Sequence, residues 1–254
     1  MTQAPRRWTI PAWEGIPGLV HGFFGRPGGV SVGAFTSLNC SERVGDDTEA
    51  VRENRHRALS GLSCERLAVP RQVHGDAIAV FEATSPAVGG ADGVIVGEPG
   101  TAAGVLTADC VPLLFVIPAA RLVAAVHAGW KGTALGIALR AVDLLCREGG
   151  GDAGSIQVGL GPAIGGCCYQ VGGEVVASME DGSGRDSLRI HRWEGDKAWI
   201  DLREVNAGLL RKAGVPAESI HLVGPCTRCN AAEFFSHRAS GGTTGRQLSA
   251  IGWQ

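Results

Sequence analysis

The sequence predicts a mixed α+β fold in a single domain, because short apolar strands are interleaved irregularly with amphipathic helices. Residues 111–117 and 122–126 are runs rich in Val and Leu on either side of Pro118, and a tight connection there would pair them antiparallel. The 39 glycines indicate many tight turns, as in a sheet-rich protein. Irregular order and antiparallel pairing argue against a doubly wound sheet. No linker divides the chain, so residues 1–254 are expected to form one domain.

The composition narrows the class of protein. The net charge is −2, so no nucleic-acid or membrane partner is expected. The N-terminus lacks the apolar core of a signal peptide and no apolar run reaches membrane-spanning length, which predicts a soluble, cytoplasmic protein. The eight cysteines are therefore expected to be free thiols or metal ligands rather than disulfides. The composition leaves the oligomeric state open and is compatible with a monomer.

Four helices are predicted, over residues 46–60, 132–148, 173–179 and 201–213. In the first, Asp46 with Glu49 three residues later resembles a capping box, and Gly61 ends the helix. The fourth begins with Asp201 as its cap. The second has an apolar face formed by Leu135, Leu139 and Val142.

Further strands are predicted in short apolar runs bounded by turn residues. They cover residues 67–73, 78–81, 94–96, 104–107, 156–160 and 220–223. The polar stretch 180–189 has few apolar residues and is predicted to be a disordered or inserted loop.

Three residues that can bind metals lie at the ends of predicted strands. Cys110 precedes one strand of the antiparallel pair and His127 ends the other, so the pairing brings both to one end of the sheet. His74 lies in a turn between two further strands. Such long spacings indicate a zinc or copper site assembled by the fold, although a nucleophilic Cys/His pair or ordinary buried side chains would give the same pattern. Asp109 could orient a ligand imidazole or cap a turn.

Two segments could bind an anion. The glycines of residues 25–33 allow backbone N–H groups to approach a ligand, but the segment has neither Walker spacing nor G-x-G-x-x-G, so a glycine loop without a ligand is the alternative. Arg52 and Arg55 share a helix face, and arginine binds oxyanions well, although such pairs are usually solvated.

The other cysteine motifs give weaker signals. Cys226 and Cys229 form a single C-x-x-C, and Cys167 with Cys168 forms a vicinal pair that does not have the spacing of a second one. A Cys₄ zinc site is therefore not predicted. A redox motif would require Cys226 to open a helix, and ordinary buried thiols are the simpler interpretation.

The ordered series of motifs resembles the bacterial multicopper-polyphenol-oxidase-like, or laccase-domain, family. The series runs through essentially the whole chain, and its most specific pieces are Q-V-H, A-D-C-V-P and H-A-G-W, followed by the tail F-F-S-H-R. The resemblance implies a layered α/β/β/α sandwich. It also implies a zinc-dependent enzyme that phosphorolyses adenosine, inosine, guanosine and methylthioadenosine and deaminates adenosine, with purine nucleosides and phosphate as its small-molecule partners.

Carried over to this sequence, the resemblance implies specific roles for individual residues. His74, Cys110 and His127 match the metal ligands of the catalytic centre. Arg55 matches an anion-binding arginine, and Asn39 belongs to the pocket motif S-L-N. Gly28 and Gly29 of the glycine loop complete the expected substrate-binding set. The tail departs from the family pattern, since His237 replaces the usual Tyr and Ala239 replaces a frequent Arg.

Three alternative functions use the same residues. Copper could occupy the three ligands and oxidise phenols in vitro, but a true multicopper oxidase needs many histidines, commonly as H-x-H, and this chain has seven and no such pair. A cysteine hydrolase would use Cys110 as the nucleophile and His127 as the base. A non-enzymatic binding or peptidoglycan-editing protein would use the metal structurally.

Overall fold

The computed structural model describes residues 4–82, 90–184 and 187–254. Two large sheets form its centre. The five-stranded sheet has the order β1 (Arg7–Trp8), β2 (Leu19–Phe24), β14 (Gln247–Trp253), β6 (Thr101–Thr107) and β3 (Arg66–Ala68). The six-stranded sheet has the order β13 (Ile220–Leu222), β9 (Gln157–Leu160), β7 (Val111–Ile117), β8 (Leu122–Ala128), β5 (Gly93–Val96) and β4 (Ile78–Val80).

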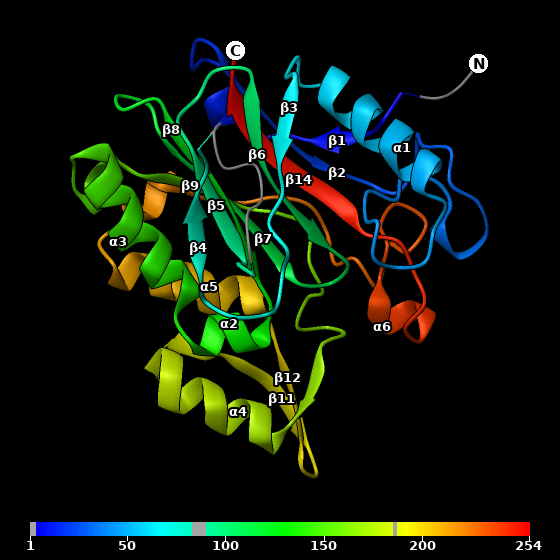
Figure 1. Cartoon of the computed structure of the whole chain (residues 1–254). Helices are drawn as coiled ribbons and strands as arrows, with labels where there is room; N and C mark the ends of the chain where they lie inside the picture. The colour runs from blue at the N-terminus through cyan, green and yellow to red at the C-terminus, as the bar shows by residue number, and fades with distance from the viewer. Residues whose placement is uncertain (1–3, 83–89, 185–186) are drawn as a thin grey trace.

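Helices cover the outer faces of the two sheets (Figure 1). The α-helices are α1 (Thr48–Ser60), α2 (Trp130–Ala134), α3 (Ile137–Gly149), α4 (Gly173–Met179), α5 (Leu202–Lys212) and α6 (His237–Ser240). Short 3₁₀ turns lie at Pro11–Trp13, Gly33–Phe35, Ala153–Ser155 and Ala217–Ser219. A small third sheet has the order β10 (Gln170–Gly172), β12 (Lys197–Ile200) and β11 (Ile190–Glu194).

The core consists of three apolar layers that follow the alternation of side chains along the strands. In β7, Leu113 and Phe115 pack on the side of α3 and α5, whereas Leu114 and Val116 point into the space between the two large sheets. The outer face of the five-stranded sheet packs on α1, with Ala58 among the contacting residues. These layers confirm the predicted mixed α/β/β/α sandwich. They also explain why strands such as β7 do not alternate between polar and apolar residues, since both faces of the strand are buried.

The predicted antiparallel pairing of β7 and β8 is confirmed. The register places Pro112 opposite His127 and Ile117 opposite Leu122. The connection includes Arg121 in the left-handed region, at a φ of 49°. Every residue of β7 is buried, so the hairpin forms the middle of the six-stranded sheet and provides a rigid base for the residues at its ends.

Two helix predictions need correction. The helix predicted over 132–148 is two helices, because Gly136 adopts a left-handed φ of 79° between α2 and α3. Leu135 lies at this break and is exposed, so its assignment to the apolar face was wrong. At the first helix, Gly61 is the C-cap as predicted, but the N-cap is Asp47, whose side chain accepts a hydrogen bond from the N–H of Ala50.

The polar stretch 180–189 is more ordered than predicted. Residues Glu180–Gly184 continue α4 as one π-helical turn, and Ser187 is nearly buried. Residues 185 and 186 of that prediction lie outside the described residues. Within the described part of the chain, no helix has both the length and the apolar character needed to cross a bilayer.

Candidate metal centre and pocket

The β7/β8 hairpin places Cys110 and His127 at one end of the six-stranded sheet. Cys110 directly precedes β7, and His127 is the second-last residue of β8, opposite Pro112. His74 approaches from the turn before β4, and its ring meets that of His127 edge to face, with centroids 4.8 Å apart. The ligand atoms of all three residues lie within 4.8 Å of one another. The structure therefore brings together the three residues that sequence reasoning selected as metal ligands.

Asp92 supports this arrangement and was not singled out from the sequence. It is fully buried just before β5, and its Oδ1 lies 2.8 Å from Nδ1 of His127. The same carboxylate accepts hydrogen bonds from the backbone N–H groups of Val73, His74 and Gly75 at 2.7 to 3.1 Å. It therefore orients one imidazole and holds the turn that carries the other. The signal in the sequence that could have identified Asp92 was an acidic residue beside a predicted buried strand.

The electrostatics of the centre favour a negative sulfur beside positive imidazole. Burial alone would raise the pKa of Cys110, but the charge of His127 and hydrogen bonds from both histidines lower it to about 6. Burial likewise acts to lower the pKa of His127, yet Cys110 and Asp92 raise it to about 9. The pKa of Asp92 is lowered despite burial, chiefly through its hydrogen bond with His127.

The three side chains fit a metal ion. One thiolate and two imidazoles are the ligands that zinc prefers, and three protein ligands leave a fourth position for water or substrate. Because Asp92 engages Nδ1 of His127, Nε2 is left as the ligand atom. Gly129 leaves room beside the group, since a Cβ there would lie 3.2 Å from Sγ of Cys110 and 3.3 Å from the ring of His74. A metal would have His74, Cys110 and His127 as ligands, and Asp92 would hold the two histidines in place.

The centre opens into a cavity of about 840 Å³, which is the size of a typical small-molecule site. His127 is buried, Cys110 is half-buried and His74 is exposed, so the group is accessible from the cavity side. The cavity wall combines the metal centre with apolar and aromatic side chains, including Leu106, Ile164, Trp130, Tyr169 and His237.

The wall carries an excess of positive charge. Among the described residues, two carboxylates lie in it, Glu42 and Asp109, and both are engaged in hydrogen bonds within the protein. The same part of the chain supplies five arginines: Arg43, Arg55, Arg71, Arg238 and Arg246. Arg55 is held by Cys40 O and Glu42, both at 2.8 Å, which fixes its guanidinium at the cavity wall. Such a wall favours an anionic ligand.

The other expected substrate-binding residues do not line the cavity. Asn39 is buried behind it, where its side chain contacts the backbone of Ser41 and Arg246 and the carboxylate of Asp46. Gly28 and Gly29 lie in a loop that packs on other segments, and the N–H of Gly29 donates to Ser37 Oγ at 3.1 Å. A Cβ on Gly29 would overlap the backbone of Ser37 and Leu38, which explains the glycine by packing.

Asp109 connects the centre to the tail of the chain. Its Oδ1 accepts a hydrogen bond from Thr227 Oγ1 at 2.6 Å, and its Oδ2 accepts one from the backbone N–H of Arg238 at 2.7 Å. The carboxylate that orients His127 is therefore Asp92, and Asp109 instead holds the segment that brings His237 and Arg238 to the cavity wall. Of the two tail residues that the sequence analysis noted as departures from the expected pattern, His237 lines the cavity wall.

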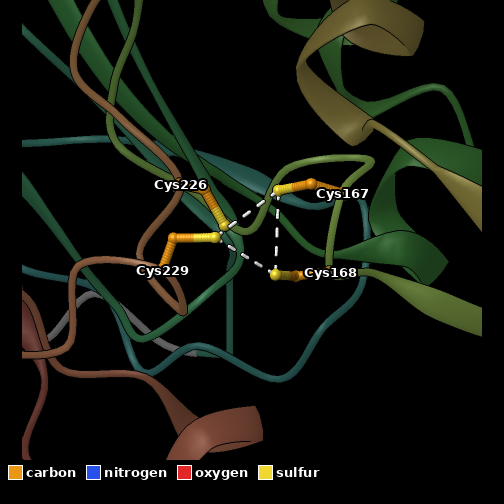
Figure 2. Close-up of side chains that lie close together, drawn as sticks. All are labelled: Cys167, Cys168, Cys226 and Cys229. Atoms are coloured by element: carbon orange, nitrogen blue, oxygen red, sulfur yellow. Dashed lines mark hydrogen bonds between the residues drawn. The ribbon is translucent and has the colours of Figure 1, made fainter.

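A second group of potential ligands lies outside the cavity wall. The sulfur atoms of Cys167, Cys168, Cys226 and Cys229 lie within 4.8 Å of one another (Figure 2). The sequence-based conclusion that the vicinal pair cannot complete a Cys₄ site was wrong, because the fold joins two motifs that are 61 residues apart. The sequence itself held no local signal for this pairing.

Comparisons with known proteins agree with this architecture. Residues 20–254 match the family model described as multi-copper polyphenol oxidoreductase laccase. The purine nucleoside phosphorylase YlmD of Geobacillus stearothermophilus is 39% identical, over 98% of this chain and 96% of the relative. The adenosine deaminase RL5, from an unknown prokaryotic organism, is 35% identical over 86% of this chain and 87% of the relative. The crystal structure of the hypothetical protein YfiH of Bacillus licheniformis is similar, with a TM-score of 0.91 and 33% identity. The match covers 100% of this chain and 98% of that one.

Proposed function

This chain belongs to the family of multi-copper polyphenol oxidoreductase laccases, and we propose that it is a zinc-dependent purine nucleoside phosphorylase that also deaminates adenosine. Its substrates would be phosphate with adenosine, inosine, guanosine or methylthioadenosine. The names of the relatives support this class of enzyme. The observation that carries the proposal is a His74, Cys110 and His127 centre in the wall of an arginine-rich cavity.

The arginines supply what phosphorolysis needs. In that reaction an oxygen of phosphate bonds to C1′ of the ribose while the bond from C1′ to N9 of the purine breaks, and the purine leaves with the electron pair. The phosphate must therefore be held beside the sugar, and its charge must be offset. Arg55 is suited to this role because Cys40 and Glu42 fix its guanidinium at the cavity wall before any ligand binds.

The aromatic side chains of the cavity suit the purine. Trp130 and Tyr169 line the wall, and the guanidinium of Arg238 lies 5.3 Å from the centre of the Tyr169 ring, so the ring is held in one place. Flat rings of this kind bury a purine at low entropic cost. The cavity therefore offers an apolar position for the base and a cationic position for phosphate.

The metal centre supports the deaminase activity. When bound, zinc would supply Lewis-acid chemistry and activate water near neutral pH. The protein's own residues keep the two imidazoles and the thiolate converged, with Asp92 fixing the tautomer of His127. Deamination then adds water at C6 of adenosine and releases ammonia, and this reaction requires no phosphate. The two activities are thus separable in one assay.

The direct test compares metal-quantified wild type with Cys110→Ala on adenosine and inosine, with and without phosphate, and identifies products by chromatography. We expect adenine and hypoxanthine to be released only with phosphate, inosine to form from adenosine in either case, and both activities to be lost in the variant. Cys146→Ala is the matched control, because Cys146 is a half-buried cysteine of α3 outside the cavity wall. Absence of turnover by zinc-loaded wild type would refute the proposal.

Copper-dependent oxidation of phenols is the second candidate function, and the description of the matching family is the observation that favours it. It uses the same three ligands. Incubating the copper-loaded protein with a phenol in air tests it directly, and Cys110→Ala again serves to show whether any oxidation comes from this centre. Turnover of phenols without turnover of nucleosides would make this the function.

A further inference from the structure

We propose that Cys167, Cys168, Cys226 and Cys229 form a second metal site, which binds a structural Zn²⁺ ion and clamps the tail of the chain to the segment that precedes β10. This site is separate from the His74, Cys110 and His127 centre and does not depend on the proposed function. All four cysteines are free thiols, and Figure 2 shows their sulfur atoms pointing toward one another from two segments.

The sulfur positions fit tetrahedral coordination. A Zn²⁺ ion with four thiolates at about 2.3 Å holds the sulfur atoms about 3.8 Å apart. The Sγ atom of Cys167 lies 3.7 Å from those of both Cys168 and Cys229, and the Sγ atoms of Cys168 and Cys229 are 3.3 Å apart. The ion therefore requires shifts of only a few tenths of an ångström at these pairs. A set of four thiolates is characteristic of zinc and of iron–sulfur sites, and a closed set of four indicates a structural role.

The backbone around Cys226 has the form that holds a metal thiolate. The N–H of Gly165 donates to Sγ of Cys226 at 3.3 Å. Residues 226–230 form a tight turn, in which the N–H of Asn230 donates to the carbonyl oxygen of Cys226 at 3.2 Å. This turn brings the sulfur of Cys229 back to the side of Cys226. A hydrogen bond to sulfur, such as the one from Gly165 to Cys226, offsets part of the negative charge that thiolate ligands accumulate.

The two segments are also joined independently of the sulfur atoms. Ala163 and Cys226 form a parallel bridge, and the N–H of Thr227 donates to the carbonyl oxygen of Ala163 at 3.0 Å. A metal at the cluster would reinforce this weak two-residue contact with four strong bonds. A metal bound by both cysteine motifs would close a loop of about 60 residues. A cross-link that closes a loop of this length stabilises the folded state substantially.

The position of the clamp gives it a consequence for the cavity. Tyr169 directly follows Cys168, and Thr227 directly follows Cys226. Tyr169 lines the cavity, and Thr227 donates to Asp109, the neighbour of Cys110. The ion would therefore hold the segment that supplies Tyr169 to the cavity wall and the segment that supports Asp109 there, without itself contacting a ligand in the cavity.

Metal content under reducing conditions tests the site. We expect two equivalents of zinc in wild type and in the control Cys146→Ser, and one equivalent in both Cys110→Ala and the double variant Cys168→Ser/Cys229→Ser. Combining Cys110→Ala with the double variant should leave none. One equivalent in wild type that disappears completely in Cys110→Ala would overturn the proposal, as would two equivalents in a folded double variant.

A second measurement does not require the cysteine variants to fold. In Cys110→Ala the first centre is removed and the cluster is intact, so exchange of zinc for Co²⁺ should give the intense absorption of a tetrahedral cobalt tetrathiolate. If the protein instead shows no such spectrum, or its mass reveals disulfides among the four cysteines in place of bound metal, the site is not a zinc site. Neither outcome depends on nucleoside turnover, so this test fails or succeeds separately from that of the proposed function.

Discussion

The Oδ1 atom of Asp92 lies 2.8 Å from Nδ1 of His127, and the same atom accepts the backbone N–H of His74 at 2.9 Å. One buried carboxylate therefore positions two of the three side chains of the candidate metal centre, one through its ring and the other through its backbone. This double role makes Asp92 the residue whose removal should disturb the centre most without removing a ligand.

Asp92→Asn should lower metal affinity by about 10- to 100-fold, because partners that orient metal-bound histidines typically contribute that much. Competition against a chromogenic chelator measures the affinity. The control is Asp76→Asn, since Asp76 lies nearby but forms an exposed ion pair with Arg140. Equal affinity in wild type and Asp92→Asn would show that the hydrogen bond to His127 is not needed for metal binding.

Arg55→Met should raise the KM for phosphate about tenfold or more, because a hydrogen bond to a charged group contributes about 1.5 to 3 kcal/mol. Deamination of adenosine, which uses no phosphate, should be retained. Arg52→Met is the matched control, as Arg52 lies one turn earlier on α1 and pairs with Glu49 in solvent. A parallel loss of both activities in Arg55→Met would indicate that the arginine supports the fold rather than phosphate binding.

His21 should make the protein less stable in mild acid. Its Nε2 accepts the N–H of Ile10 at 2.8 Å, which requires the neutral ring, and burial followed by the charge of Arg7 lowers its pKa to about 4. This pKa is below the value of about 6.5 in the unfolded chain. The contribution of neutral His21 to the free energy of unfolding is therefore complete above pH 6.5 and is lost as pH falls toward 4. The loss should reach up to about 3 kcal/mol.

Urea unfolding at a series of pH values measures this effect. In His21→Gln the decline between pH 6.5 and 4 should be shallower than in wild type, whereas His56→Gln, on the exposed side of α1, should follow wild type. Parallel curves for wild type and His21→Gln would contradict the assignment to His21.

Gly29→Ala should destabilise the fold by about 2 kcal/mol or more, because the added Cβ meets backbone atoms of Ser37 and Leu38 that cannot rotate away. Gly15→Ala should be close to neutral, since no heavy atom lies within 4 Å of the Cβ position there. Thermal unfolding compares the two. If Gly29→Ala keeps its stability but loses phosphate affinity, the glycine acts at the ligand rather than in packing.

Local pairing allowed part of the site to be predicted. Cys110 precedes the first strand of a single hairpin and His127 lies near the end of the second, so the strand pattern alone places them together. Asp92 could not be recognised in the same way, because its partners come from a turn and from a strand far along the chain. The four-cysteine cluster was missed for the same reason, since its two halves meet only through the tertiary fold.

The fold class followed from strand and helix patterns, but several details did not, among them the break between α2 and α3, the small third sheet and the strand β14. The break between α2 and α3 depends on the backbone conformation of Gly136, which a periodic apolar pattern does not encode. The strand β14 carries small and polar residues along with its apolar ones, so it was not predicted, although all of its residues are buried in the sheet.

The place of β14 in the five-stranded sheet has a consequence for biosynthesis. It follows all the other strands of this sheet in the sequence, yet it lies between β2 and β6 (Figure 1). Its Ile251 pairs with His21, 230 residues earlier in the chain. Until β14 emerges, β2 and β6 have no partner on their facing edges. A nascent chain therefore exposes two unpaired edges during most of its synthesis, which makes that period the one in which aggregation competes with folding.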